Sequence, residues 1–176
     1  MQIPLEEILI LKGASNAKYE YTLLKTLKSC RDKGVSSVIY SDIFLDDIRE
    51  YREYILAKVG LKGVFPLWKK DTMLLSRVFL DLGFKAIITS VDSYFIGKDF
   101  VGREYDEKLL LDLPAKVDSC GENGEFHTFV YDGPIFRTKV GFKKGAITFR
   151  NNRFYCCDLL PTSQDKNKTK KGMNKI

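Results

Sequence analysis

Two glutamates stand three positions apart in a glycine-rich segment, residues 120–128, whose sequence is Cys-Gly-Glu-Asn-Gly-Glu-Phe-His-Thr. Gly121 and Gly124 permit backbone conformations with positive φ and let the main chain come close to a ligand. Glu122 and Glu125 could hold ammonia or an ammonium ion, coordinate Mg²⁺, or accept protons in general base chemistry. The structural alternative is a hairpin loop with solvated glutamates, and chemistry alone favours neither interpretation.

A thiol and the only histidine of the sequence lie in the same segment, at Cys120 and His127. Such a pair suggests a nucleophile and its base. The spacing across a glycine-rich loop specifies no geometry, and no third residue is evident to orient the base. We therefore do not favour nucleophilic catalysis by the thiol.

Other candidates precede this segment. Asp42 and Trp68 each follow a short apolar run that predicts a strand, and open α/β sheets bind ligands at the carboxyl ends of their strands. Asp42 could serve Mg²⁺ or a ribose, or cap the following helix, whereas Trp68 could pack on an adenine or a substrate, or lie in the core. The guanidinium groups of Arg49, Arg52 and Arg103 match phosphate or carboxylate bidentately. Acidic neighbours one helical turn away could pair with Arg49 instead.

The composition is ordinary for a soluble globular protein, with 44% hydrophobic and 30% charged residues. The 176 residues fit one domain with a continuous core. No apolar run approaches the ~20 residues that span a bilayer, so we expect no membrane-spanning helix. The first residues have neither the basic leader nor the cleavage site of a signal peptide, which makes a cytoplasmic location the default expectation.

The net charge of +6 could indicate nucleic-acid binding, so its location matters. Residues 165–176 contain five lysines against one aspartate, a net of +4. This end has no apolar pattern, and we predict a disordered basic tail over residues 161–176. Such a tail could touch RNA weakly, but a solvated end is favoured and nucleic-acid binding is not expected. One histidine and four cysteines without suitable spacing also predict no zinc site.

Up to residue 113, short apolar runs alternate with amphipathic helical stretches, which is typical of a parallel sheet with helices on both faces. The apolar runs predict buried strands, and the periodic stretches that stop at glycines predict helices. The predicted strands are residues 8–11, 35–40, 64–65 and 86–88, and the predicted helices are residues 16–33 (capped by Ser15 or Asn16), 45–60, 71–82 and 104–113.

Beyond Pro114 the pattern changes to a loop rich in Gly and Asp, followed by short strands. We interpret this part as an antiparallel ribbon added to the parallel sheet. The predicted organisation is therefore an α/β domain over residues 1–113, a substrate-side loop with antiparallel strands over residues 114–160, and the tail. Within the ribbon, the predicted strands are residues 126–131, 138–142, 146–150 and 153–158, with hairpin turns at residues 143–145 and 151–152.

The glycine-rich segment and the Asp132-Gly133-Pro134 run resemble a signature of the diphthine–ammonia ligase family and related PP-loop ATP pyrophosphatases. In that family, Gly-Glu-x-Gly-Glu-Phe is followed by a strand and then by Asp-Gly-Pro. The resemblance covers about residues 3 to 142. Further matches, in family order, are Ser41-Asp42-Ile43 with Arg49 on the next helix, Pro66-Leu67-Trp68, residues 83–88 and Gly102-Arg103.

The resemblance implies a PP-loop (HUP-like) α/β domain that uses ATP and Mg²⁺. Family members are thought to adenylate a carboxylate, releasing pyrophosphate, and then to let ammonia displace AMP to form an amide. The substrates would be ATP, ammonia and a carboxylate, which can be carried by a protein. Arg52 has no matching family position, and we favour an ordinary structural role for it. By resemblance, Glu122 and Glu125 would be catalytic, and the nucleotide or substrate contacts would be Asp42, Arg49, Trp68, Arg103, Gly121, Asn123, Gly124 and His127.

The sequence departs from the family chiefly because the Ser-Gly-Gly-Lys-Asp-Ser loop that binds ATP is absent, and Ser41 also stands where glycine is common in the family. Residues 96–100 mimic only its middle, and we interpret them as a surface loop. We therefore expect the C-terminal portion of a ligase whose first βαβ unit is missing, and poor triphosphate binding by this chain alone. The alternatives are a non-catalytic module that binds a nucleotide or a protein and, on the tail alone, a basic RNA-binding adaptor. A missing strand would expose a sheet edge, so we expect a homodimer or a missing N-terminal segment.

Overall fold

The computed structural model describes residues 4–11 and 13–162. The chain divides between residues 70 and 71 into two compact units, which we call the first and the second unit in chain order. Within the described ranges, no helix is both long and apolar enough to cross a membrane. The predicted basic tail lies outside the described residues from residue 163 onward.

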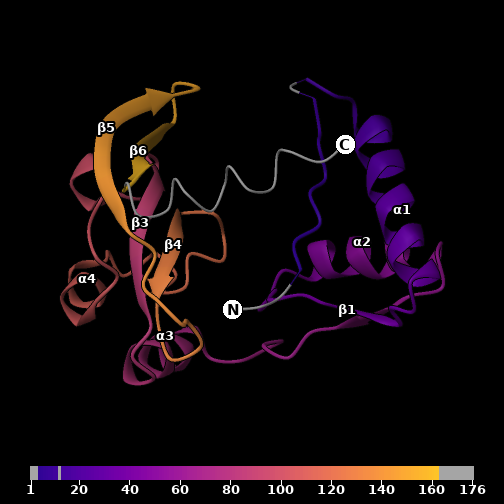
Figure 1. The fold of residues 1–176 in the computed structure, drawn as a ribbon. Coiled ribbons are helices and arrows are strands. Elements are labelled where there is room, and N and C mark those ends of the chain that lie inside the picture. The colour runs from indigo at the N-terminus through magenta and orange to yellow at the C-terminus, as the bar shows by residue number, and fades with distance from the viewer. Residues whose placement is uncertain (1–3, 12, 163–176) are drawn as a thin grey trace. The chain divides into compact units, whose positions relative to one another are not determined.

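The first unit consists of two helices and a small parallel sheet (Figure 1). Its first helix begins at the predicted cap, because the Ser15 side chain accepts a hydrogen bond from the backbone N–H of Lys18. Leu27, Ile55 and Leu56 form the centre of its buried core. The elements are α1 (Asn16–Asp32), β1 (Ser37–Ile39), α2 (Asp46–Ala57) and β2 (Lys62–Val64), and β1 pairs with β2 in parallel.

Two strand predictions in this unit need correction. Residues 8–11 do not form a strand, and Leu9 is 86% exposed. An apolar run becomes a strand only where a neighbour accepts its backbone hydrogen bonds, and the parallel sheet described here contains β1 and β2 alone. The strand predicted as buried over residues 35–40 is shorter, and Ile39 at its end is 71% exposed.

The second unit is built on a four-stranded antiparallel sheet with the strand order β4-β3-β6-β5. Its helices are short, and the side chain of Asp71 caps the first of them by accepting from the N–H of Leu74. Ile88, Val91 and Phe126 from the sheet lie in one buried core. The elements are α3 (Thr72–Asp81), β3 (Lys85–Asp92), the 3₁₀ helix η1 (Lys98–Phe100), α4 (Glu107–Asp112), β4 (Phe126–Asp132), β5 (Phe142–Arg150) and β6 (Phe154–Pro161).

The predicted α/β class is confirmed, with a parallel sheet and an antiparallel part, but the two are separate sheets. The strand predicted over residues 86–88 is wrong as a member of the parallel sheet, because it belongs to β3, which pairs antiparallel with β4 and β6. Strand β6 pairs only with Ser90–Asp92 of β3. The segment 102–105 lies along the earlier part of β3, since Gly102 N–H donates to the Ile88 carbonyl and Ile88 N–H donates to the Arg103 carbonyl. The division between the two compact units lies between residues 70 and 71, whereas the sequence pattern changes from alternating helices and strands to short strands at residue 114.

Two loop predictions also need correction. Residues 143–145 lie within β5, where an irregularity in register replaces the predicted turn. Residues 96–100 are not simply a surface loop, because Ile96 and Phe100 are buried in the core and only residues 97–99 between them are exposed. The turn at residues 151–152 is confirmed, with both asparagines at positive φ as a tight hairpin requires.

Candidate functional site

The glycine-rich segment forms a loop that leads from α4 into β4, and one carboxylate organises it. Asp118 Oδ1 accepts hydrogen bonds from the backbone N–H groups of Cys120 at 2.9 Å and Glu122 at 3.1 Å. Gly121 and Gly124 have φ values of +70° and +84°, as predicted. The loop is therefore folded back on itself by hydrogen bonds from its own backbone to the Asp118 side chain before it reaches the sheet. We call residues 118–125 the glutamate loop.

Glu125 is enclosed at the end of this loop. Its side chain is 1% exposed, and Oε1 accepts from the backbone N–H of Asp118 at 3.0 Å and from the Asn123 side-chain amide at 2.9 Å. Its second oxygen, Oε2, is buried without a hydrogen-bond partner in the described part of the chain. The hydroxyl of Ser119, in the same loop, is likewise buried and unpaired among the described residues. Buried polar atoms of this kind are few in native proteins and need an explanation.

Glu122 differs from Glu125 in its environment. It is only half-buried, and its main chain is held by Asp118. The carbonyl of Glu125, by contrast, accepts from the backbone N–H of Asp92 at the end of β3. The structure therefore encloses one of the two candidate carboxylates against the sheet and leaves the other nearer the surface.

Cys120 packs against α3, because its Sγ donates to the Thr72 carbonyl at 3.3 Å and lies 3.6 Å from the Ser76 hydroxyl. Burial raises the pKa of the Cys120 thiol, which favours the protonated and less nucleophilic form. His127 is exposed on β4, opposite Ser90 of β3. None of the described contacts joins the thiol to the imidazole.

Arg103 lies in the second unit and has an acidic partner. Its guanidinium forms an ion pair with Asp112 of α4 at 2.7 Å and lies 5.0 Å from the centre of the Phe100 ring. A phosphate or carboxylate ligand would therefore have to compete with Asp112. The neighbouring Glu104 accepts a hydrogen bond from the hydroxyl of Tyr131 at 2.6 Å. Burial and this carboxylate both raise the pKa of Tyr131.

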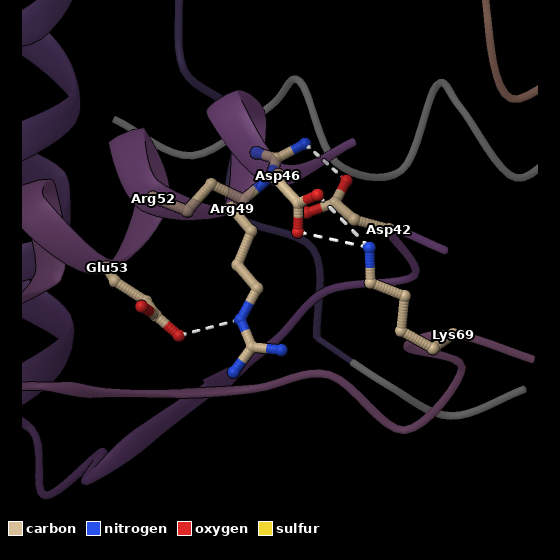
Figure 2. Close-up of polar contacts among 6 residues, drawn as sticks. All are labelled: Asp42, Asp46, Arg49, Arg52, Glu53 and Lys69. Atoms are coloured by element: carbon tan, nitrogen blue, oxygen red, sulfur yellow. Dashed lines mark hydrogen bonds and ion pairs between the residues drawn. The ribbon is translucent and has the colours of Figure 1, made fainter. Parts of the chain in front are cut away.

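The candidates of the first unit form a cluster of ion pairs (Figure 2). Arg52 binds Asp42 bidentately, with Nε and Nη2 at 2.5 and 3.0 Å from the carboxylate oxygens. Arg49 pairs with Glu53 one helical turn away at 2.9 Å. An acidic neighbour at this spacing is the structural alternative that the sequence indicated for Arg49. Asp42 does not cap α2, whose first turn has no side-chain cap. No local pattern predicts the Arg52–Asp42 pair, because the two residues come from different elements.

Aromatic rings lie beside these ion pairs. The Arg49 guanidinium is 4.7 Å from the centre of the Phe65 ring and 4.6 Å from that of Trp68. Tyr40, just beyond β1, stacks on Phe65, just beyond β2, with centroids 5.5 Å apart. The carboxyl ends of the parallel strands thus present planar rings and paired cations, the kinds of group that contact a planar or anionic ligand.

The comparison with protein families identifies the second unit. The family model described as the diphthamide synthase C-terminal domain matches residues 71–159. The chain belongs to this diphthamide synthase family. The matched residues begin where the second unit begins and include the glutamate loop, β3, β4, β5 and β6 up to its last two residues.

Curated relatives agree with this assignment. The chain is 31% identical over 125 residues to a protein of Danio rerio named diphthine–ammonia ligase, covering 68% of this chain and 48% of that protein. It is 30% identical over 125 residues to the human protein of the same name, covering 68% of this chain and 46% of that protein. A Schizosaccharomyces pombe protein of that name is 32% identical over 92 residues, covering 50% of this chain and 15% of that protein. The chain therefore spans about half the length of the animal relatives.

The structure also identifies residues that the sequence did not single out. Asp118 holds the glutamate loop closed, and Ser119 contributes a buried hydroxyl beside it. Tyr105 supports the same place, because its hydroxyl donates to the Ser119 carbonyl at 2.6 Å. An aspartate just before the glycine-rich segment could have suggested a turn-forming role. No local pattern could have predicted the contact from Tyr105, which lies 14 residues earlier.

Proposed function

We propose that this chain provides the C-terminal portion of a ligase that forms an amide from a carboxylate and ammonia, as the name diphthine–ammonia ligase describes for its relatives. The family match supports the proposal. The observation that carries it is the enclosed carboxylate of Glu125 in the glutamate loop. A buried acceptor beside a glycine-rich main chain suits a small nitrogen reactant, which needs to be oriented and relieved of a proton.

In the proposed reaction, a carboxylate oxygen attacks the α-phosphorus of ATP and pyrophosphate leaves. The nitrogen of ammonia then attacks the carbonyl carbon, the bond to AMP breaks, and the nitrogen loses one proton. Within this scheme Glu122 and Glu125 would handle ammonia and its proton, and Arg103 would contact an anionic group after release from Asp112. Asn123, His127 and the two glycines of the loop would line the substrate side.

The described residues do not fit the triphosphate of ATP. The N-terminus of α1 is already capped by Ser15, and no glycine-rich turn joins a strand to it. They also contain no group of three or more His, Cys, Asp or Glu side chains that could hold a metal ion. We therefore assign neither the phosphates nor Mg²⁺ to this chain. Asp42, Arg49 and Trp68 remain predicted contacts for a nucleotide base or a substrate, and the cytoplasmic location remains a prediction.

Because the phosphates of ATP are not assigned to this chain, the test combines the purified chain with a separate N-terminal portion of a relative that carries the ATP loop. The mixture is supplied with ATP, ¹⁵N-ammonium and a protein that carries diphthine. Pyrophosphate release and incorporation of ¹⁵N into the protein would support the ligase function. Replacing Glu125 with glutamine, which keeps the shape but removes the charge, should then abolish the labelled amide. The matched control is Glu107→Gln, an exposed acid on α4 of the same unit. Full amide formation by the Glu125 variant would contradict the assigned role.

The second candidate is a non-catalytic module that binds a nucleotide or a protein. The ion pairs that already hold Arg49, Arg52 and Arg103 favour it, because an anionic substrate would have to displace Glu53, Asp42 or Asp112 from them. Titration of the chain with ATP and with the diphthine-bearing protein separates the two functions. Binding of either one, without any pyrophosphate release, would support the module and refute catalysis by this chain.

A further inference from the structure

The antiparallel sheet of the second unit ends at β5, the last strand in the order β4-β3-β6-β5 (Figure 1). In the described part of the chain, β5 pairs with β6 alone, so no strand lies beside the backbone N–H and C=O groups of its other side. The opposite edge, at β4, is met by the N–H of Val140, which donates to the Tyr131 carbonyl. An open edge nine residues long can pair with an extended polypeptide.

The two halves of β5 differ in how they protect this edge. Lys143 and the register irregularity between Lys144 and Ile147 are features that keep an edge strand from pairing unspecifically. The half from Ile147 to Arg150 is regularly paired with β6. Its Ile147 and Phe149 side chains are 44% and 50% exposed, and they lie on the same face because they are two positions apart. Exposed apolar side chains on a regular edge favour a binding surface over protection alone.

The charge of this part of the sheet is one-sided. Residues 133–157 contain six lysine and arginine residues and no aspartate or glutamate. Residues 71–132 of the same unit contain six lysine and arginine residues against twelve aspartate and glutamate residues. The excess positive charge is therefore concentrated in the hairpin of β5 and β6 and in the segment just before it. Arg150 forms an exposed ion pair with Asp158, and such a pair contributes little stability, so its guanidinium remains available to a partner's carboxylate.

Charge and backbone together select among three kinds of occupant. A second copy of this chain would bring two basic segments together, and like charges on paired strands are destabilising. An RNA strand suits the charge, but it has no row of peptide N–H and C=O groups to pair with an open strand edge. The ring of Phe149 is also already packed against that of Tyr155, with centroids 4.6 Å apart. An acidic polypeptide in an extended conformation satisfies both the charge and the edge.

We propose that β5 is a docking edge for an acidic, extended segment of a partner protein, which adds a fifth strand to the sheet. The register with β6 puts Ile147 and Phe149 on one face of the sheet, where they contact the apolar side chains of the added strand. Lys143 and Arg150 lie on the opposite face, where they meet its carboxylates. The inference is independent of the proposed function, because no residue of β5 is assigned to the ligase reaction.

The experiment titrates the whole chain with three synthetic peptides of equal length. The first alternates glutamate with valine, the second has lysine in place of every glutamate, and the third keeps the glutamates but has proline in place of two central valines. Proline removes backbone donors and is poorly tolerated inside a sheet. The first peptide should bind saturably, and its affinity should fall as salt is added. The lysine and proline peptides should bind much more weakly.

Amide hydrogen exchange locates the bound peptide, which is necessary because the lysines of residues 165–176 could also attract an acidic peptide. At a peptide concentration of roughly ten times its Kd, the outward-facing amides of residues 147–150 should exchange about tenfold more slowly. Unchanged exchange in β5 would overturn the inference, and so would equal binding by the proline peptide. Slower β5 exchange on raising the concentration of the chain alone would assign the edge to a second copy. Tighter binding of an oligouridylate of equal charge, with the same protection, would assign it to RNA. Either result would also overturn the inference.

Variants test the two kinds of contact separately. Ile147→Thr keeps a β-branched side chain but removes apolar surface, and it should weaken binding of the acidic peptide several-fold. Its matched control is Leu160→Thr, because Leu160 is 54% exposed on β6, which is not an edge strand. Lys143→Glu combined with Arg150→Glu should weaken binding of the acidic peptide by about tenfold and improve that of the lysine peptide. Full affinity for the acidic peptide in this folded double variant would contradict the inference.

Discussion

Gly121 and Gly124 offer a matched pair for testing whether the glutamate loop is built as the structure shows. Both have positive φ, at +70° and +84°, so an alanine at either position occupies a left-handed conformation that costs about 1–2 kcal/mol. Their surroundings differ. A Cβ at Gly121 would lie 2.9 Å from the carbonyl oxygen of Phe126 and 3.1 Å from its ring, whereas a Cβ at Gly124 would meet nothing within 4 Å.

Phe126 cannot move away easily, because it is 3% exposed and is the first residue of β4. Overpacking a buried place of this kind typically costs about 1–3 kcal/mol more. We therefore expect Gly124→Ala to lower the free energy of unfolding of the second unit by about 1 kcal/mol and Gly121→Ala by about 2–4 kcal/mol. The difference between the two changes in the free energy of unfolding therefore measures the cost of the close contact with Phe126, because the cost of the backbone conformation is common to both variants.

The measurement has to report on the second unit alone, since a chain of two units need not unfold in a single step. The only tryptophan, Trp68, lies in the first unit, so its fluorescence is unsuitable. Amide hydrogen exchange of β4 is suitable, because exchange through unfolding speeds up about tenfold for each 1.4 kcal/mol lost. Gly124→Ala should accelerate exchange about 5-fold and Gly121→Ala about 30- to 700-fold. Equal acceleration by the two variants would refute the close approach of Gly121 to Phe126.

Two further predictions concern other ion pairs. The Arg153 guanidinium lowers the pKa of Asp92 below its ordinary value of 3.8, so the stability that this carboxylate contributes is present above pH 3.8 and is lost as the pH falls through its lower folded-state pKa. Asp92→Asn should flatten the acid decline of β3 exchange protection, and an unchanged decline would contradict this. Arg49→Met should shift the Trp68 fluorescence by removing the guanidinium above the ring and cost about 0.5–1 kcal/mol. Glu53→Gln is its control, because it removes the ion pair and should keep the stack and the emission.

The local parts of the fold were predictable because their signals are local. Ser15 caps α1 as expected, and Gly83 follows the end of α3. Asn151 and Asn152 form the tight turn between β5 and β6, since asparagine tolerates positive φ better than most residues. In each case one side chain or one backbone conformation determines where an element begins or ends. The residue type at that position is therefore enough to predict the boundary.

Strand pairing was not predictable in the same way. The apolar run at residues 86–88 predicts a buried strand, and Ile87 and Ile88 are indeed buried. A continuous apolar run fits a parallel strand or the centre of an antiparallel sheet equally well. The choice depends on β4 and β6, which lie more than thirty residues further along the chain. Residues 8–11 show the opposite case, because an equally apolar run forms no strand.

The difference between Glu122 and Glu125 arises from this strand pairing. The two residues have the same chemistry and similar glycine neighbours, so the sequence treats them alike. Glu125 is enclosed because Val91 pairs with Phe126 and the N–H of Asp92 then binds the Glu125 carbonyl at 2.8 Å. A slip of one residue in this register would turn every side chain of β4 to the other face of the sheet. The burial of the Glu125 carboxylate therefore depends on the register between β3 and β4, which no short motif can encode.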